Sequence, residues 1–223
     1  RNSRLINEGD TMRNRSCSSI LGVFFLTIAV SAATVLESPV ADAAMRSDIE
    51  TMRNLLYQGA DVNAAQGDGM TALHWAAVNG QPEMSEMLLY AGASTEATTR
   101  MGAYTPLHLA SREGHAGVVQ SLLAAGSDPN QKTSTGGVAA LHFAAASGDM
   151  NTIEALLEYG AVIDEKETKS GQTPLIFAAS LDRVGAIKIL ASNGADLSSQ
   201  TAVVDLVARE RSQKKQEMPG TPS

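Results

Sequence analysis

Three histidines are the first residues of this chain whose type and spacing suggest chemistry. His74, His108 and His142 recur at intervals of 34 residues, and imidazole nitrogen is a common ligand of zinc. Equivalent residues of successive repeats lie on neighbouring helices, whose axes pack about 8 to 10 Å apart. Zinc requires each ligating nitrogen about 2.1 Å from one centre, so we expect neither a metal site nor a cofactor.

No other group of residues forms a catalytic set. Cys17 is the only cysteine and lies near the N-terminus, so the rest of the chain has no disulfide and no thiolate nucleophile. The serines are not set in a nucleophile elbow, and the sequence contains no glycine-rich phosphate loop. We interpret the carboxylates of residues 164–167 as solvated loop residues. The sequence therefore favours a protein that is not an enzyme.

A repeated block indicates which elements position the histidines. It occurs four times with the same period, as Thr71-Ala72-Leu73-His74, Thr105-Pro106-Leu107-His108, Ala139-Ala140-Leu141-His142 and Thr173-Pro174-Leu175-Ile176. A fixed period of about 20 to 50 residues is typical of stacked repeat proteins. A second marker, an apolar pair followed by glycine, ends at Gly59, Gly92, Gly126, Gly160 and Gly194. Each unit is thus predicted to be a helix, a turn, a second helix and an extended loop.

The first helix of each unit has residues suited to its start and its end. A threonine oxygen can cap the helix, proline is tolerated at the first helical position, and glycine suits the turn that follows. The structural residues assigned in this way are Thr71, Thr105, Thr173, Pro106 and Pro174, with turn glycines at Gly80, Gly114 and Gly148. The paired helices are expected to form hairpins.

This combination resembles the ankyrin repeat, whose T-P-L-H-x-A pattern is matched by Thr105 to Ala110 and whose G-A-D turn is matched by Gly59 to Asn63. The resemblance covers roughly residues 38–211. It implies an all-α ankyrin-repeat solenoid of helix-turn-helix units with projecting β-hairpin or finger loops. It also implies that His74, His108 and His142 hydrogen-bond the backbone and cap between adjacent units. We expect about five units, at 38–65, 66–98, 99–132, 133–167 and 168–199, and a C-terminal capping helix at 200–211.

The later units depart from the pattern. Ala139 replaces a capping threonine, which by itself costs about 1 kcal/mol. Ile176 replaces the histidine and Asp182 replaces the turn glycine. We therefore expect the C-terminal end of the stack to be the less stable one. His115 is interpreted as a surface residue at a helix turn.

The ends of the chain differ in character from the repeats. Residues 12–32 combine a short basic region, an apolar stretch and small residues, which is typical of a cleaved signal peptide. We expect residues 1–11 to be an upstream translation artefact, residues 33–37 a linker and residues 212–223 a disordered tail. Cleavage is expected after Ala32 or Ala33 rather than after Ala43, which would divide a predicted helix. The alternative is an uncleaved membrane anchor, since residues 18–36 are uncharged and can just span a bilayer.

Export and charge limit the possible partners. Either interpretation of the N-terminus places the repeats outside the cytoplasm, in a periplasm or secreted. From Ala33 onward, 22 acidic and 13 basic residues give a net charge of −9. Such a surface disfavours nucleic acid and anionic membranes as partners. We expect a monomer with no membrane contact beyond the export signal.

A protein-binding surface is the remaining function. The ankyrin resemblance places it on the loop tips and on the exposed positions of each first helix, which here include Gln66, Asp68, Met70, Asn79, Arg100, Met101, Tyr104, Arg112, Glu113, Thr133, Thr135, Lys166, Lys169 and Gln172. Arginine, methionine and aromatic side chains are enriched in interfaces, so we expect Arg100, Met101, Tyr104 and Arg112 of the third unit to be the centre of binding. The alternative is that Tyr104 packs against a neighbouring loop and that Arg100 is only solvated.

One apolar row requires a separate interpretation. Trp75, Leu109, Phe143 and Phe177 recur at the same repeat position. Packing between helices explains this row better than a ligand strip does.

The expected function is non-catalytic binding of another protein by an exported ankyrin-repeat protein. The resemblance to exported bacterial members implies two kinds of partner, a periplasmic enzyme that the protein supports or a secreted toxin that it neutralises as an immunity protein. A secreted effector that binds a host protein is a further alternative.

Overall fold

The computed structural model describes residues 38–199, which form ten α-helices joined by turns and loops. The helices are α1 (Pro39–Met45), α2 (Ile49–Tyr57), α3 (Ala72–Asn79), α4 (Pro82–Tyr90), α5 (Pro106–Glu113), α6 (Ala116–Ala124), α7 (Ala140–Ser147), α8 (Met150–Glu158), α9 (Pro174–Ser180) and α10 (Val184–Ser192). The predicted leading residues 1–11, signal peptide 12–32, linker 33–37, capping helix 200–211 and tail 212–223 lie outside the described residues.

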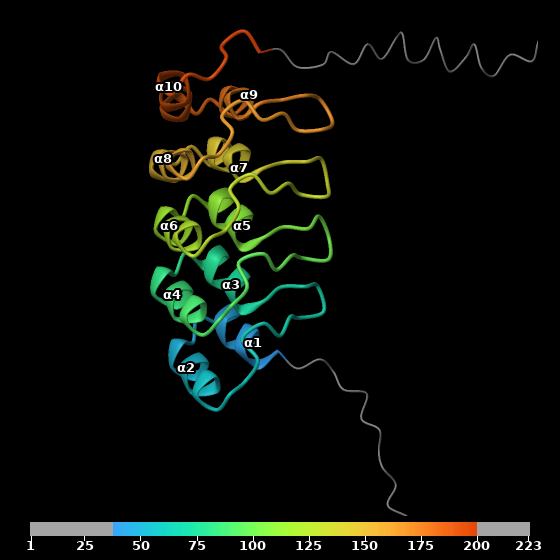
Figure 1. Cartoon of the computed structure of the whole chain (residues 1–223), viewed down its shortest axis with the longest axis vertical. Coiled ribbons are helices and arrows are strands. Elements are labelled where there is room, and N and C mark those ends of the chain that lie inside the picture. The colour runs from blue at the N-terminus through green and yellow to red at the C-terminus, as the bar shows by residue number, and fades with distance from the viewer. Residues whose placement is uncertain (1–37, 200–223) are drawn as a thin grey trace, which may run out of the picture. The chain divides into compact units, whose positions relative to one another are not determined.

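The helices form two columns (Figure 1). The odd column contains α1, α3, α5, α7 and α9, and the even column contains α2, α4, α6, α8 and α10. Each odd helix packs against its neighbours in the column and against the even helix that follows it, and α4, α6, α8 and α10 pack in series. The predicted all-α repeat solenoid is confirmed. The boundaries of the five units remain predictions.

Backbone conformation explains how the helices end. Gly80, Gly114 and Gly148 have φ values of 64°, 73° and 83°. Glycine adopts this left-handed region without the steric cost of a Cβ atom. Asp182 has the equivalent position in the last unit, with φ of 55°. Its Cβ atom adds a steric cost that glycine avoids, although aspartate tolerates this region better than most residues, so the turn between α9 and α10 is less favourable than the glycine turns.

The apolar core lies between the two columns and follows the repeat. Leu73, Leu107 and Leu141 are buried in the odd column, and Leu88 and Leu122 are buried in the even column. Complete burial of one leucine side chain stabilises the fold by roughly 1.5 to 3 kcal/mol. Because each helix packs mainly against its neighbours in the stack, the stack is stabilised by a series of local interfaces.

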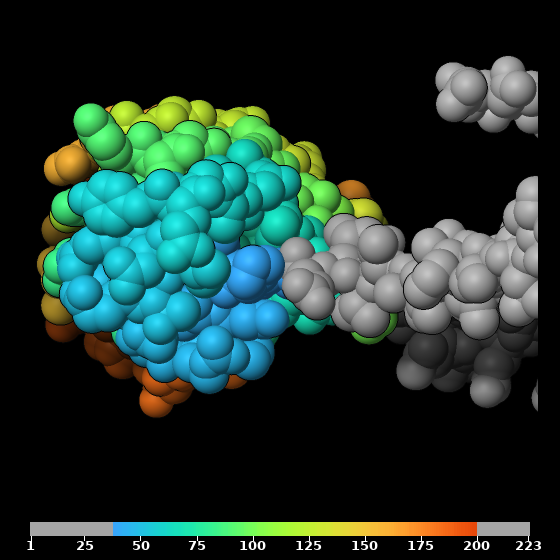
Figure 2. All heavy atoms as spheres, turned by 90° about the horizontal axis from the view of Figure 1, so that it is seen from below, coloured from blue at the N-terminus to red at the C-terminus, as the bar shows by residue number. Residues whose placement is uncertain are grey.

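The first helix pair covers the N-terminal end of the stack. Figure 2 views this end, where α1, α2 and the residues that follow them form the surface. Pro39 begins α1, and Val40, Ala41, Ala43 and Ala44 of this helix are fully buried. A cut after Ala43 would therefore divide a packed helix.

The loops that connect the units extend beyond the odd column (Figure 1). Residues 38–199 contain no β-strand, although an isolated bridge pairs Lys132 with Ala139. Backbone hydrogen bonds of 2.8–2.9 Å connect successive loops, from Arg100 N–H to Asp68 O, from Ser134 N–H to Gly102 O and from Thr168 N–H to Gly136 O. Gly69 permits one of these contacts, since a Cβ atom there would lie 2.7 Å from the Arg100 nitrogen. The loops are thus held as one continuous surface.

Candidate functional site

The repeated histidines are buried and connect each first helix to the backbone of a loop further along the chain. Nδ1 of each accepts the backbone N–H of the residue three positions earlier, from Thr71 to His74 at 3.1 Å, from Thr105 to His108 at 3.1 Å and from Ala139 to His142 at 3.3 Å. Nε2 of each lies 2.9–3.2 Å from a carbonyl oxygen, that of Tyr104, Gln131 or Gln172. An Nδ1 that accepts and an Nε2 that donates define the neutral tautomer with its proton on Nε2.

Burial opposes protonation of these rings. It lowers the pKa of His108 from 6.5 to about 4, although hydrogen bonds to the backbone of Gln131 and Val138 act in the opposite direction. Burial also lowers the pKa of His74 and of His142. Both nitrogens of each ring are already engaged with the backbone. Within residues 38–199, no three or more histidine, cysteine or carboxylate side chains are grouped to hold a metal ion.

The threonine caps differ between units. Thr105 Oγ1 lies 2.8 Å from His108 Nδ1 and accepts the His108 backbone N–H at 3.4 Å. Thr71 Oγ1 lies 2.8 Å from His74 Nδ1. Thr173 does not cap its helix as predicted, because its buried hydroxyl has no hydrogen-bond partner within the described residues. Ile176 stands where the other units have an imidazole that could accept from that hydroxyl.

Two loop side chains predicted to be solvent-facing are buried. Thr133 is 3% exposed, and its Oγ1 accepts the Val138 N–H at 3.0 Å. Glu167 holds the equivalent position one period later, is 6% exposed, and accepts backbone N–H groups from Lys169, Ser170 and Gln172. Burial raises the pKa of Glu167, but these N–H donors outweigh burial and lower it overall. The predicted exposure of both side chains is wrong, because each turns inward to satisfy the amides of its own loop.

His115 also differs from its interpretation as a surface residue. It is half-buried, and its Nε2 donates to the Val78 carbonyl of the preceding unit at 3.1 Å. Arg183 makes the equivalent contact two periods later, from Nε to Ala146 O at 2.9 Å. These side chains tie the turns of one unit to the first helix of the unit before it.

A groove on the odd column brings together six of the predicted binding residues. Its volume is about 530 Å³. Helices α3 and α5 and the two loops that precede them supply its lining, which consists of Gly67, Asp68, Met70, Trp75, Val78, Thr99, Arg100, Met101, Tyr104, Leu109 and Arg112. We call it the odd-column groove. The predicted centre of binding, residues 100, 101, 104 and 112, therefore lies on one concave surface.

Specific contacts hold the aromatic residues of the odd-column groove. Trp75 Nε1–H donates to Gln66 Oε1 at 2.8 Å, and Gln66 donates in turn to Asp42 of α1 at 2.5 Å. The Tyr104 ring is edge-on to the His108 ring and lies 5.8 Å from the Phe143 ring between centroids. Tyr104 thus packs against residues of its own and the next unit and also lines the groove. These contacts hold the Trp75 and Tyr104 side chains in place, so the shape of the groove is set by the chain itself.

The charged groups at the odd-column groove are mostly positive. Arg100 is exposed, and Arg112 pairs with Glu113 from Nε to Oε1 at 2.9 Å on the surface. Asp68 is the carboxylate of the lining, and its Oδ1 accepts the Met70 N–H at 2.9 Å. Met101 is 86% exposed. The groove therefore presents two guanidinium groups and a free apolar side chain around an apolar floor.

Comparison with known proteins identifies the repeats. A family model for ankyrin repeats, in three copies, matches residues 40–133 and 118–201. The chain belongs to the ankyrin-repeat family. Ankyrin repeats indicate a protein–protein interaction module. Among the described helices of this ankyrin stack, none has the length and apolar character needed to cross a membrane.

Several known proteins resemble parts of the ankyrin stack. The chain is 33% identical over 85 residues to human protein phosphatase 1 regulatory subunit 27. The matched stretch is 37% of this chain and 55% of that protein. It is 43% identical over 56 residues to palmitoyltransferase akr1 of Schizosaccharomyces pombe, covering 25% of this chain and 9% of the relative. It is 41% identical over 64 residues to potassium channel AKT1 of Oryza sativa subsp. indica. That match covers 29% of this chain and 7% of the channel. The chain therefore spans less than two thirds of each relative.

The other predicted binding residues of the ankyrin stack lie outside the odd-column groove. Asn79 donates from Nδ2 to Ala44 O of the first unit at 3.1 Å, so its amide is already hydrogen-bonded within the stack. Thr135, Lys166 and Lys169 are exposed on later loops, and Gln172 is half-buried there. The structure does not gather these residues into the groove.

The apolar row has both a packing role and a lining role. Leu109 belongs to the core, and the Phe177 ring lies 5.1 Å from the His142 ring between centroids. Trp75 packs against the core and lines the odd-column groove together with Leu109. Packing between helices thus accounts for Phe177, whereas Trp75 and Leu109 also face the groove.

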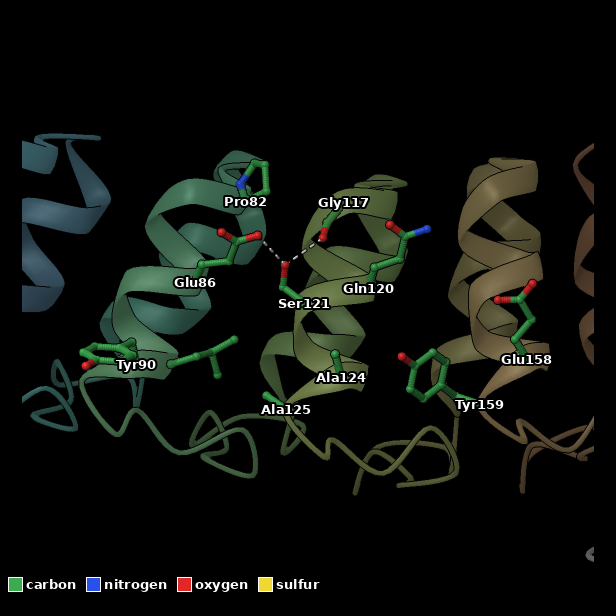
Figure 3. Close-up of a pocket in the computed structure, with 11 residues that line it drawn as sticks. Pro82, Glu86, Tyr90, Gly117, Gln120, Ser121, Ala124, Ala125, Glu158 and Tyr159 are labelled. Carbon is green, nitrogen blue, oxygen red and sulfur yellow. Dashed lines mark hydrogen bonds between the residues drawn. The ribbon is translucent and has the colours of Figure 1, made fainter.

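Sequence reasoning missed a larger groove on the even column (Figure 3). Its volume is about 800 Å³, and its lining consists of Pro82, Glu86, Leu89, Tyr90, Gly117, Gln120, Ser121, Ala124, Ala125, Glu158 and Tyr159. We call it the even-column groove. The available signal was a difference in side-chain size. Helix α6 ends at Ala124 and is followed by Ala125, whereas α4 ends in Tyr90 and α8 is followed by Tyr159. No single repeat motif contains that signal.

Proposed function

We propose that this chain is an exported, non-catalytic ankyrin-repeat module that binds a segment of another protein in the odd-column groove. The observation that carries the proposal is the convergence of Arg100, Met101 and Arg112 on an apolar floor formed by Trp75 and Leu109. Arginine and methionine are enriched in protein interfaces, and anchors in well-packed pockets dominate binding energy. The loop-to-loop hydrogen bonds hold this surface in place, which lowers the entropy cost of binding.

The chemistry of the groove indicates the kind of segment that fits. An apolar side chain of the partner would contact Trp75, Val78 and Leu109, and a carboxylate beside it would meet Arg100 or Arg112. Bidentate geometry makes arginine well suited to carboxylates. The partner segment is therefore apolar with flanking acidic residues, although the whole module is acidic.

Export is part of the same proposal and is supported by the sequence of residues 12–32. In that compartment the candidate partners are a periplasmic enzyme that the module supports and a secreted toxin that it neutralises. A host protein bound by a secreted effector is the other candidate. The name of the human relative, a regulatory subunit of a phosphatase, favours attachment to an enzyme over catalysis by the repeats themselves.

Affinity capture from a periplasmic extract tests the proposal. The bait is the chain from Ala33 onward, beside a variant with Arg100→Gln, Met101→Ser and Arg112→Gln. Tyr104 is left intact because its ring packs against His108 and Phe143. A matched control, Arg53→Gln with Lys188→Gln, removes the same number of positive charges from the even column.

We expect the bait and the matched control to capture one common protein that the groove variant does not capture. Addition of that protein should also change the fluorescence of Trp75, the only tryptophan of the chain. Equal capture by the groove variant, with its helical content unchanged, would show that binding does not use the odd-column groove.

A further inference from the structure

The even-column groove has a shape set by side-chain size. Its floor consists of small residues of α6, Gly117 and Ala124, and of Ala125 just after the helix. Tyr90 at the end of α4 and Tyr159 just after α8 stand on either side of these alanines (Figure 3). The depression thus arises because the middle helix lacks a bulky residue where its two neighbours carry tyrosine.

The tyrosine side chains on this face contribute little to the core. Tyr90 is 96% exposed and Tyr159 is 49% exposed. A second depression of about 380 Å³ lies between α2 and α4, and its lining includes Arg53, Tyr57 and Tyr90. Tyr90 therefore stands between two hollows on an open helical surface. Exposed tyrosine next to a hollow is typical of residues that anchor interfaces.

The three helices around the even-column groove carry charge of one sign. Helices α4, α6 and α8 contain four carboxylates, Glu83, Glu86, Glu154 and Glu158, and no lysine or arginine. Glu86 and Glu158 belong to the lining of the even-column groove. Ser121 Oγ lies 3.5 Å from Glu86 Oε1 and donates to Gly117 O at 3.1 Å, so among residues 38–199 Glu86 makes only this long contact (Figure 3).

We propose that the even-column groove binds a lysine- or arginine-bearing segment of a second protein. Glu86 and Glu158 would pair with its cationic groups, and the Tyr90 and Tyr159 rings would receive its aliphatic stems or the cations themselves. A cation over a tyrosine face is attracted by the ring quadrupole. Small residues on the floor allow such a chain to lie close to α6. Charge complementarity selects this occupant, since an acidic segment would be repelled by all four carboxylates.

This inference does not depend on the proposed function of the odd-column groove. The two grooves lie on different columns and present opposite charge, with arginines at one and carboxylates at the other. A module of this kind holds an acidic segment on one side and a basic segment on the other.

The test uses two short synthetic helical peptides of equal length that carry leucine beside either lysines or glutamates. Binding to the chain from Ala33 onward is measured by isothermal titration and by chemical-shift changes in a ¹H–¹⁵N spectrum. One variant, Glu86→Gln with Glu158→Gln, removes two groove carboxylates without changing side-chain size. A matched control, Asp68→Asn with Glu113→Gln, removes the same charge from the odd column. A third variant, Ala124→Arg, fills the hollow with a cation of the protein itself.

We expect the lysine peptide to bind and to shift signals of α4, α6 and α8, while the fluorescence of Trp75 stays constant. The Glu86/Glu158 variant should weaken binding roughly fivefold at low ionic strength, the odd-column control should leave it unchanged, and Ala124→Arg should abolish it. Equal weakening by the control would mean that net charge alone attracts the peptide and would overturn the proposal. Binding of the glutamate peptide would overturn it as well.

Self-association is the competing outcome. If sedimentation shows a dimer that the Ala124→Arg variant converts to a monomer, a second copy of the chain occupies the groove and the proposal of a basic partner fails. A change in Trp75 fluorescence with the lysine peptide would instead place the peptide in the odd-column groove. That result would contradict this inference and also the acidic segment proposed for that site.

Discussion

Stability should fall on mild acidification because His108 is folded in its neutral form. The folded ring has a pKa of about 4, against 6.5 for an unperturbed histidine. Between these values the unfolded chain binds more protons than the folded chain, so the free energy of unfolding decreases as the pH is lowered through this interval. From about pH 7 to about pH 5, the loss from His108 alone is about 2 kcal/mol.

The measurement is urea denaturation of the chain from Ala33 onward at several pH values between 7 and 5. His74 and His142 act in the same direction, since burial lowers the pKa of each. The interval stays above the usual carboxylate range. Glu165 and Glu167 have pKa values lowered from 4.5, and their protonation destabilises the fold only below the chosen interval.

A His108→Gln variant separates this effect from the overall charge. It should be less stable at neutral pH by roughly 1 to 3 kcal/mol, because the buried Thr105 N–H and Gln131 carbonyl lose their partners. Its stability should also fall by about 2 kcal/mol less than that of the natural chain over the same pH interval. The matched control is His115→Gln, which also removes one histidine but leaves the contacts of His108 in place. An unchanged slope in His108→Gln would refute the assignment of the neutral ring.

Three further predictions concern single positions and the N-terminus. Ala139→Thr restores the hydroxyl found beside the other repeated histidines and should raise the stability of the stack by about 1 kcal/mol in urea denaturation; a loss of stability would mean that the buried site cannot accept the larger side chain. Asp182→Gly removes strain at a φ of 55° and should raise stability by about 1 kcal/mol, with Asp182→Ala as a control that keeps the Cβ and gains nothing. N-terminal sequencing of the exported protein should begin at Ala33 or Thr34, because Ala43 is fully buried in α1; a first residue of Ala44 would contradict this.

The repeat pattern was sufficient to predict the helical stack because its signals are local. Thr105 before α5, Pro106 at its first position and Gly114 after it set the bounds of that helix within one stretch of sequence. Leu107 and Leu122 recur at the same positions in neighbouring units, so their common burial also follows from the period.

Contacts that use polar side chains of single loops were harder to predict. Glu167 and Thr133 are chemically unlike, yet both close their loops by accepting backbone N–H groups. A charged residue in a loop usually remains in solvent, so composition gave the wrong expectation for Glu167. The hydrogen bond from His115 to Val78 O also connects different units through a residue outside the repeated motif.

The two grooves differ in how far sequence could reveal them. Four residues of the odd-column groove, Arg100, Met101, Tyr104 and Arg112, were predicted as a centre of binding. They are residue types common in interfaces, and they lie close together in the sequence of one unit. The even-column groove depends on what α6 lacks, with tyrosines contributed 69 residues apart, at Tyr90 and Tyr159. Two periods would separate equivalent residues by 68 positions, so the two tyrosines are not at equivalent repeat positions. A search for repeated residues therefore does not find the pair.

The bridging histidines also bear on how the length of this protein can change during evolution. His74 and His142 each donate to a carbonyl 30 residues further along, next to the start of the following first helix. If one complete period were duplicated or lost, the Nε2 of such a histidine would still face a carbonyl before the next first helix. The new contact between units would then have the same hydrogen bond as the old one. Insertion of a single residue in the same interval would displace the acceptor from its donor. Whole-unit rearrangements of the gene are thus better tolerated by this interior than the smallest in-frame insertions.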